Sequence, residues 1–126
     1  MSAEKGLQTR TEVMGADFVE RALTNTNEFN APLQEWINAH AWGSVWQREG
    51  LPRQTRSLVT IAMLTALKCT TELKGHVRGA LNNGCSVAEI REVLLHSAVY
   101  CGVPATQEAF RAAQEVISEW QTKQTQ

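Results

Sequence analysis

Hydrophobic residues recur at intervals of three and four along most of this chain, the spacing that places them on one face of an α-helix. No stretch alternates with period two, and no β-hairpin signal separates the apolar stretches. The pattern therefore predicts an all-α bundle of about six helices joined by short loops. We expect these helices over roughly residues 11–24, 33–46, 53–67, 70–83, 86–101 and 105–119.

Capping signals support several of these boundaries. The segment SVAE at 86–89 is a capping box, in which a serine and a glutamate satisfy the first free backbone N–H groups of a helix. Gly84 follows LNN and suits the position after a helix end, and Gly102 stands two residues before Pro104. The polar tail near residues 121–126 is expected to be disordered.

The third predicted helix differs from the others because it is apolar almost all round from Leu58 onward. A helix of this kind is either buried at the centre of a fold or wedged between subunits. The sequence leaves both possibilities open.

Composition indicates one ordinary globular domain, residues 1–126. Twelve basic and thirteen acidic residues are spread evenly and give a net charge of −1, which argues against a nucleic-acid partner. No stretch reaches the ~20 apolar residues that span a bilayer, and the N-terminus lacks the apolar region of a signal peptide. We therefore expect a cytoplasmic protein that is not bound to a membrane.

The cysteines and histidines do not form a recognisable metal or disulfide pattern. Cys69, Cys85 and Cys101 are odd in number and far apart, and no CxxC occurs. The three histidines are equally scattered. We expect neither a disulfide framework nor a metal site, and most single cysteines of this kind are small buried apolar residues.

One short stretch, CTTELKGH at 69–76, gathers groups that can carry chemistry. Cys69, Glu72 and His76 stand at i, i+3 and i+7, on one side of a helix. The segment could be a redox centre that lacks its second cysteine. Alternatively, Glu72 fixes the tautomer of His76 and raises its pKa, which makes a general acid or base for use near neutrality. A boundary ion pair without catalytic role is the third possibility.

A second candidate region is rich in tryptophan. Trp42 and Trp46 stand at i and i+4, and Glu35, His40 and Arg48 lie close by in sequence. The two indoles could be core residues, or they could form the flat wall of a small pocket, with Gly43 allowing close approach of another helix.

Two arginines precede the apolar helix. Arg56 stands two residues before a continuous apolar stretch, where a permanent cation needs an anion. Its partner could be the carboxylate of a substrate or an acidic side chain of the protein. Arg53 lies one turn earlier.

Four segments together resemble the γ-carboxymuconolactone decarboxylase family of the protocatechuate branch of aromatic degradation. They are LQEWINAHAWGSVWQREGL, RSLVTIAMLTAL, ELKGHVRGALNNG and EIREVLLHSAVYCGVPATQEAF, and the resemblance covers roughly residues 10–118. It implies the all-helical fold of the alkylhydroperoxidase D-like superfamily, no cofactor, and assembly as a trimer or hexamer with active sites at subunit contacts.

The resemblance also separates the interpretations of 69–76. Thiol peroxidases of that superfamily carry CxxCxxxH, with a glutamate twelve residues before the first cysteine. Here Cys69 takes the first cysteine position, Glu72 the second, and Ser57 the place of the upstream glutamate. Without a resolving cysteine no intramolecular disulfide forms, so dithiol turnover fails. The carboxylate–imidazole interpretation is favoured.

The resemblance implies a lactone dicarboxylate substrate and a role for each candidate residue. His76 would donate a proton, oriented by Glu72, and Arg56 would hold a carboxylate with Arg53 or Arg48 as a second anchor. Trp42 and Trp46 would exclude water, and Tyr100 or a backbone N–H would polarise the lactone carbonyl. Glu35 and His40 are candidates for the pocket rim. A peroxidase-like enzyme using Cys69 and a non-catalytic ligand-binding oligomer are the alternatives.

Overall fold

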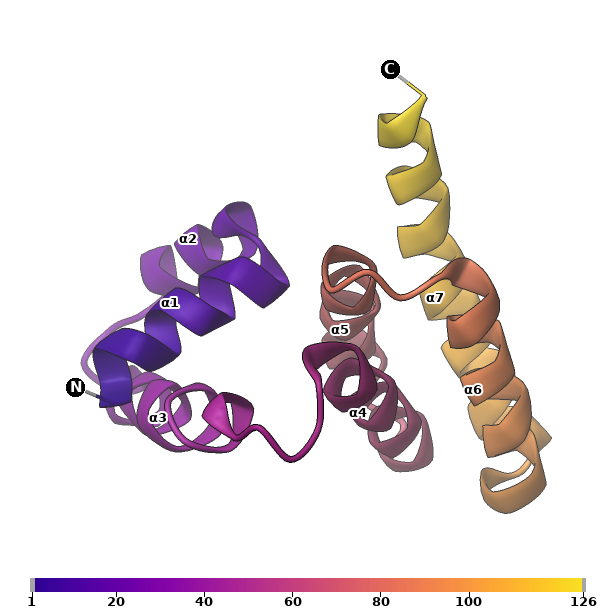
Figure 1. Cartoon of the computed structure of the whole chain (residues 1–126), viewed down its shortest axis with the longest axis horizontal. Coiled ribbons are helices and arrows are strands. Elements are labelled where there is room, and N and C mark those ends of the chain that lie inside the picture. Colours follow the sequence, from indigo (N-terminus) through magenta and orange to yellow (C-terminus); the bar gives the residue numbers. More distant parts are fainter. Residues whose placement is uncertain (1, 126) are drawn as a thin grey trace. The chain divides into compact units, whose positions relative to one another are not determined.

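A computed structural model describes residues 2–125, and every regular element in that range is helical (Figure 1). The all-α prediction is confirmed. The chain divides into two compact units, Met1–Arg53 and Gln54–Gln126, and the single domain indicated by the sequence stays a prediction. The elements are α1 (Ser2–Met14), α2 (Ala16–Thr24), α3 (Ala31–Trp36), the π-helix η1 (Ile37–Trp42), the 3₁₀-helix η2 (Val45–Gln47), α4 (Arg53–Leu67), α5 (Thr70–Asn82), α6 (Val87–Cys101) and α7 (Val103–Gln124).

The first unit is built on α1, which packs mainly against η1. Its small core contains Val13, Met14 and Trp42. The sequence predicted one helix over 11–24, but the structure has two, because the backbone turns at Gly15 with φ of 96°. The predicted helix over 33–46 is also divided, into α, π and 3₁₀ segments.

Two glycines set how closely α1 approaches η1. A Cβ atom on Gly6 would lie 1.8 Å from the carbonyl oxygen of Asn38 and 2.6 Å from the backbone nitrogen of Gly43. A Cβ atom on Gly43 would lie 2.1 Å from the carbonyl oxygen of Ser2. Gly43 therefore does allow close approach of another helix, as predicted, and the helix is α1.

A buried arginine joins the same elements. Arg10 is 8% exposed, and its Nη1 donates to Oε1 of Gln34 at 2.9 Å and to Oδ1 of Asn38 at 3.1 Å. Burial lowers the pKa of this guanidinium from its usual value, because the charged form loses hydration. The two amide oxygens, one from α3 and one from η1, offset part of that cost.

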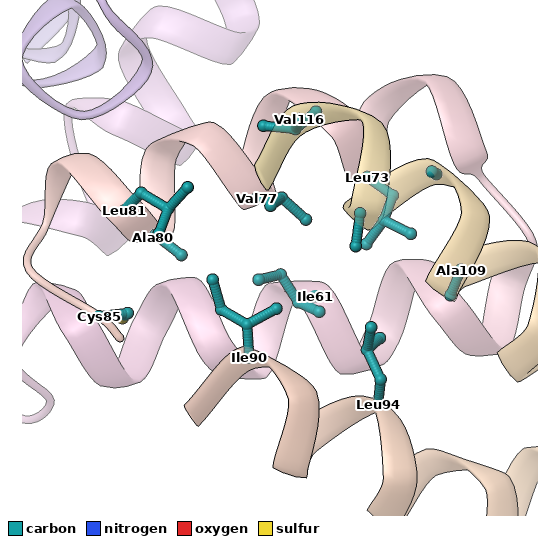
Figure 2. Packing of buried hydrophobic residues seen from close by; sticks show 12 residues of the cluster. Ile61, Leu73, Val77, Ala80, Leu81, Cys85, Ile90, Leu94, Ala109 and Val116 are labelled. Carbon is teal, nitrogen blue, oxygen red and sulfur yellow. The ribbon is translucent and has the colours of Figure 1, made fainter. Parts of the chain in front are cut away.

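The second unit is a four-helix arrangement in which α7 packs against both α5 and α6. Figure 2 shows side chains of α4, α5, α6 and α7 pointing toward one another. Ile61, Leu73, Val77 and Ile90 are fully buried there. Removing a side chain as large as Ile61 or Leu73 from such a core costs about 2–5 kcal/mol, so this cluster holds α5 firmly in place.

The predicted helix ends of the second unit are confirmed at two positions. Ser86 and Glu89 form the reciprocal capping box at the start of α6. After α5, Gly84 has φ of 91°, a conformation that a residue with a Cβ atom rarely adopts. The N–H of Gly84 donates to the carbonyl of Leu81, and the N–H of Cys85 to that of Ala80, which is a Schellman motif.

Two differences from prediction concern α7 and α4. α7 runs to Gln124, past the predicted end near residue 119 and through part of the predicted disordered tail, whose last residue lies outside the described range. α4 buries one stripe, Ser57, Ile61 and Thr65, but leaves Met63 60% exposed and Leu67 70% exposed. It is therefore not buried all round within this chain.

Candidate functional site

His76 and Glu72 lie one turn apart on α5, as the sequence predicted. His76 is half-buried, beside the fully buried Val77, and Glu72 is exposed in the first turn. At this spacing the two side chains are neighbours on one face of the helix. Orientation of His76 by Glu72 stays a prediction.

Arg56 lies in the first turn of α4, in the same unit as His76, and is half-buried. The next residue, Ser57, is fully buried, and its Oγ accepts a hydrogen bond of 2.9 Å from Nδ2 of Asn83. This bond joins the first turn of α4 to the end of α5.

The cysteines are thiols with no disulfide among the described residues. Cys69 is the N-cap of α5 and is half-buried, with Sγ 3.7 Å from the carbonyl oxygen of Leu67. Cys85 is buried, and its pKa is raised by burial and, to a smaller extent, by the charge of Glu89. A raised pKa disfavours the thiolate, so Cys85 is a poor nucleophile.

The aromatic candidates of the first unit form two ring contacts. Trp42 and Trp46 stack with centroids 4.6 Å apart and planes 28° apart, and Trp42 is 5% exposed within the core of that unit. Trp36 and His40 are both exposed, with ring centroids 5.0 Å apart. The buried position of Trp42 fits the core alternative, and Trp46, which is half-buried, keeps surface for a ligand.

The remaining candidates are on the surface. Arg53 forms an ion pair of 3.4 Å with Glu12, and both side chains are about half exposed, at 41% and 46%. Such a pair adds little stability, so Arg53 could release it for a substrate carboxylate. Arg48 and Glu35 are exposed. Tyr100 is 78% exposed and contacts the ring of His96 at 5.2 Å between centroids.

Residues 2–125 contain neither a metal-binding cluster nor a helix that could span a membrane. No group of three or more histidine, cysteine, aspartate or glutamate residues is placed to hold a metal ion. No helix in that range is long and apolar enough to cross a membrane.

Sequence reasoning missed two polar contacts. The hydrogen bond between Asn83 and Ser57 was not predicted, because the segment LNNG was assigned only the role of ending a helix. That role does not use both asparagine side chains, so one of them is available for another contact. The buried Arg10 was missed because an arginine in an amphipathic helix usually faces solvent.

Comparison with known proteins gives a consistent result. The model of the carboxymuconolactone decarboxylase family matches residues 31–115. A 4-carboxymuconolactone decarboxylase of Acinetobacter baylyi is 48% identical over 116 residues, which are 92% of this chain and 87% of the relative. A nitrosuccinic acid decarboxylase of Metarhizium robertsii is 47% identical over 116 residues, 92% of this chain and 81% of the relative.

The family model extends across both units, from α3 to α7. It includes all the predicted site residues, from Glu35 to Tyr100. With this match and two relatives near half identity over nearly the whole chain, the protein belongs to the carboxymuconolactone decarboxylase family.

Proposed function

We propose that this protein decarboxylates γ-carboxymuconolactone to the β-ketoadipate enol-lactone without a cofactor, in the catabolism of aromatic compounds. The observation that carries the proposal is 48% identity, over 92% of the chain, to a protein named 4-carboxymuconolactone decarboxylase. The half-buried His76 on α5 supplies a group suited to the chemistry.

The substrate has its own electron sink. When the bond between the ring carbon and its carboxylate breaks, CO₂ leaves and the electron pair moves through the ring double bond into the lactone carbonyl. The resulting dienolate takes up a proton at carbon and becomes the enol-lactone. The protein must therefore hold two carboxylates, stabilise the growing charge on oxygen, and supply one proton.

His76 is the proposed proton donor, with Glu72 as its orienting carboxylate. A positioned general acid contributes about 10²–10⁴-fold to a rate. A half-buried imidazole beside an apolar core has limited hydration, which suits proton transfer to carbon better than an exposed one.

Arg56 is the proposed carboxylate anchor, and Arg53 or Arg48 the second. A guanidinium can donate two parallel hydrogen bonds to one carboxylate, which fixes the orientation of the substrate as well as its position. We assign exclusion of water to Trp42 and Trp46, polarisation of the lactone carbonyl to Tyr100, and the pocket rim to Glu35 and His40.

The decisive assay is incubation of the purified protein with enzymatically generated γ-carboxymuconolactone. We expect release of one CO₂ for each lactone consumed, and appearance of the enol-lactone. Lactone binding seen by thermal shift without CO₂ release would instead indicate a non-catalytic binding protein.

A second substrate needs testing because of the relative named for nitrosuccinic acid. Nitrosuccinate also carries two carboxylates. One of them is attached to the carbon that bears the nitro group, and a nitro group can accept an electron pair. We expect measurable but slower turnover of nitrosuccinate than of the lactone in the same CO₂ assay. If nitrosuccinate is turned over faster than the lactone, nitrosuccinate replaces the lactone as the proposed substrate.

Cys69 is expected to be dispensable. Cys69→Ala should leave decarboxylation within about twofold of the wild type, since no step of the proposed reaction uses a thiol. The same variant serves as a probe for the peroxidase-like alternative. A large loss of decarboxylation, or dithiol-dependent peroxide consumption by the wild type that Cys69→Ala abolishes, would support thiol chemistry instead.

We also propose that the protein works in the cytoplasm as a homo-oligomer, a trimer or a hexamer. Three cysteines kept as thiols fit a reducing compartment. Val59, Met63 and Leu67 form an exposed apolar stripe on α4, and Leu95 and Val99 form another on α6. Monomeric proteins rarely expose such patches. Light scattering is expected to give three or six times the mass of one chain, and a monomer mass would contradict this part.

A further inference from the structure

We infer that Asn83 is a positioning residue for Arg56: the turn Asn83–Gly84–Cys85 clamps the first turn of α4 and so fixes the guanidinium relative to His76. This inference rests on the proposed function, since it concerns how the proposed carboxylate anchor is placed. Nothing in the spacing of Arg56 and His76 along the chain, twenty residues apart, suggests such a link.

The contacts come from Asn83 and Cys85, the two residues that flank Gly84 in the turn. Nδ2 of Asn83 donates to Oγ of Ser57 at 2.9 Å. Sγ of Cys85 lies 3.5 Å from the carbonyl oxygen of Gln54, and a Cβ on Gly84 would meet Nε2 of Gln54 at 3.9 Å. The turn thus touches α4 at Gln54 and at Ser57, on either side of Arg56 in sequence.

The turn itself is rigid, which a clamp requires. Gly84 is held in its left-handed conformation by the two Schellman hydrogen bonds to Leu81 and Ala80. Cys85 is 5% exposed and belongs to the core of the second unit, where Figure 2 shows it at the end of the α5 chain segment. On the other side, Ser57 is fully buried, so its hydrogen bond with Asn83 is little weakened by water.

The helical repeat connects this clamp to the proton donor. Asn83 follows His76 by seven residues, which is two turns, so the two side chains point to the same flank of α5 about 10 Å apart along its axis. The first turn of α4 is therefore fastened to the flank that carries His76. A substrate with two carboxylates needs its carboxylate anchor and its proton donor at a fixed separation. The hydrogen bond between Asn83 and Ser57 would fix that separation.

Replacing Asn83 leaves His76 in place, because α5 is held by its own backbone bonds and by the core residues Leu73 and Val77. The first turn of α4 loses a contact, and Arg56 moves with it. The effect should therefore be on substrate binding. In Asn83→Ala we expect KM for the lactone to rise about tenfold, which is the size of one lost charge-assisted interaction, here that between Arg56 and the substrate carboxylate. We expect kcat to change by less than about threefold.

The test is a double-mutant cycle with Arg56. Wild type, Asn83→Ala, Arg56→Ala and the double variant are compared for kcat and KM on γ-carboxymuconolactone. If Asn83 acts through Arg56, Asn83→Ala has almost no further effect once Arg56 is alanine. An equal rise in KM in both backgrounds, or a loss confined to kcat, overturns the inference.

Ser97→Ala is the matched control, because Ser97 is also a buried serine of this unit but its hydroxyl donates only to the carbonyl of Val93 in its own helix. It should leave KM unchanged, whereas Ser57→Ala should reproduce the rise seen with Asn83→Ala. A matching rise in Ser97→Ala would mean that general loosening of the unit explains the effect.

Amide hydrogen exchange tests the clamp without any substrate. Asn83→Ala should speed exchange at residues 57 and 58, in the first turns of α4, while the capped start of α6 near residue 90 keeps its wild-type rate. Unchanged exchange at 57 and 58 contradicts the clamp. A wild-type protein that does not release CO₂ would contradict the proposed function instead, and the exchange result would still decide the clamp.

Discussion

Replacing His76 by alanine is expected to lower kcat for decarboxylation by at least about 100-fold, because the dienolate then has no positioned proton donor. KM should change little, since the carboxylate anchor is a different residue. The variant should fold, because His76 is half-buried and makes no part of the apolar cluster that holds α5. The measurement is CO₂ release from the lactone, with circular dichroism and light scattering to check fold and assembly.

Two further variants make this result specific to the proton. His76→Gln keeps a polar side chain of similar reach but has no titratable group, and we expect it to be about as slow as His76→Ala. Arg78→Ala is the control: Arg78 lies on α5 two residues after His76 but forms an ion pair with Glu119, and its loss should leave kcat unchanged. Near-normal turnover by His76→Ala would refute the assignment of His76 as proton donor.

Introducing a single methyl group at Gly6 is expected to destabilise the first unit by about 3 kcal/mol or more. The new Cβ atom would lie 1.8 Å from the carbonyl oxygen of Asn38 and 2.6 Å from the nitrogen of Gly43, and both are backbone atoms that cannot rotate away. α1 must therefore separate from η1, which breaks the contact that forms the unit. Three of the four tryptophans, Trp36, Trp42 and Trp46, lie in this unit, so their fluorescence during urea unfolding reports on it.

Gly50→Ala is the matched control for that experiment. A Cβ atom at Gly50 would meet nothing within 4 Å, and its φ lies outside the left-handed region. We expect a change in unfolding free energy of less than about 1 kcal/mol, with stabilisation the favoured direction because alanine restricts the unfolded chain. If Gly6→Ala and Gly50→Ala unfold at the same urea concentration, the close approach of α1 and η1 does not contribute to stability.

The patterns that were predicted well are those in which neighbouring residues determine the structure. The capping box at Ser86 and Glu89 and the turn at Gly84 depend on residues at most a few positions apart, and both are present. The i, i+4 placement of Glu72 and His76 follows from helical geometry alone. Gly15 was the local exception, because an isolated glycine inside an apolar periodicity does not reveal that its φ is positive.

The sequence by itself determined that the chain is all-helical, where several helices start and stop, and that one turn of α5 carries a carboxylate and an imidazole. These properties follow from short-range sterics and from the 3.6-residue repeat. Only the tertiary structure decided that Gly6 meets Gly43, that Arg10 is buried among amides, and that Asn83 is bonded to Ser57. Each of these contacts joins residues 24 to 37 positions apart. Such pairs depend on how the helices pack, because packing must match the shapes of the helices and provide partners for buried polar groups. The periodicity of residues along the chain does not encode either requirement.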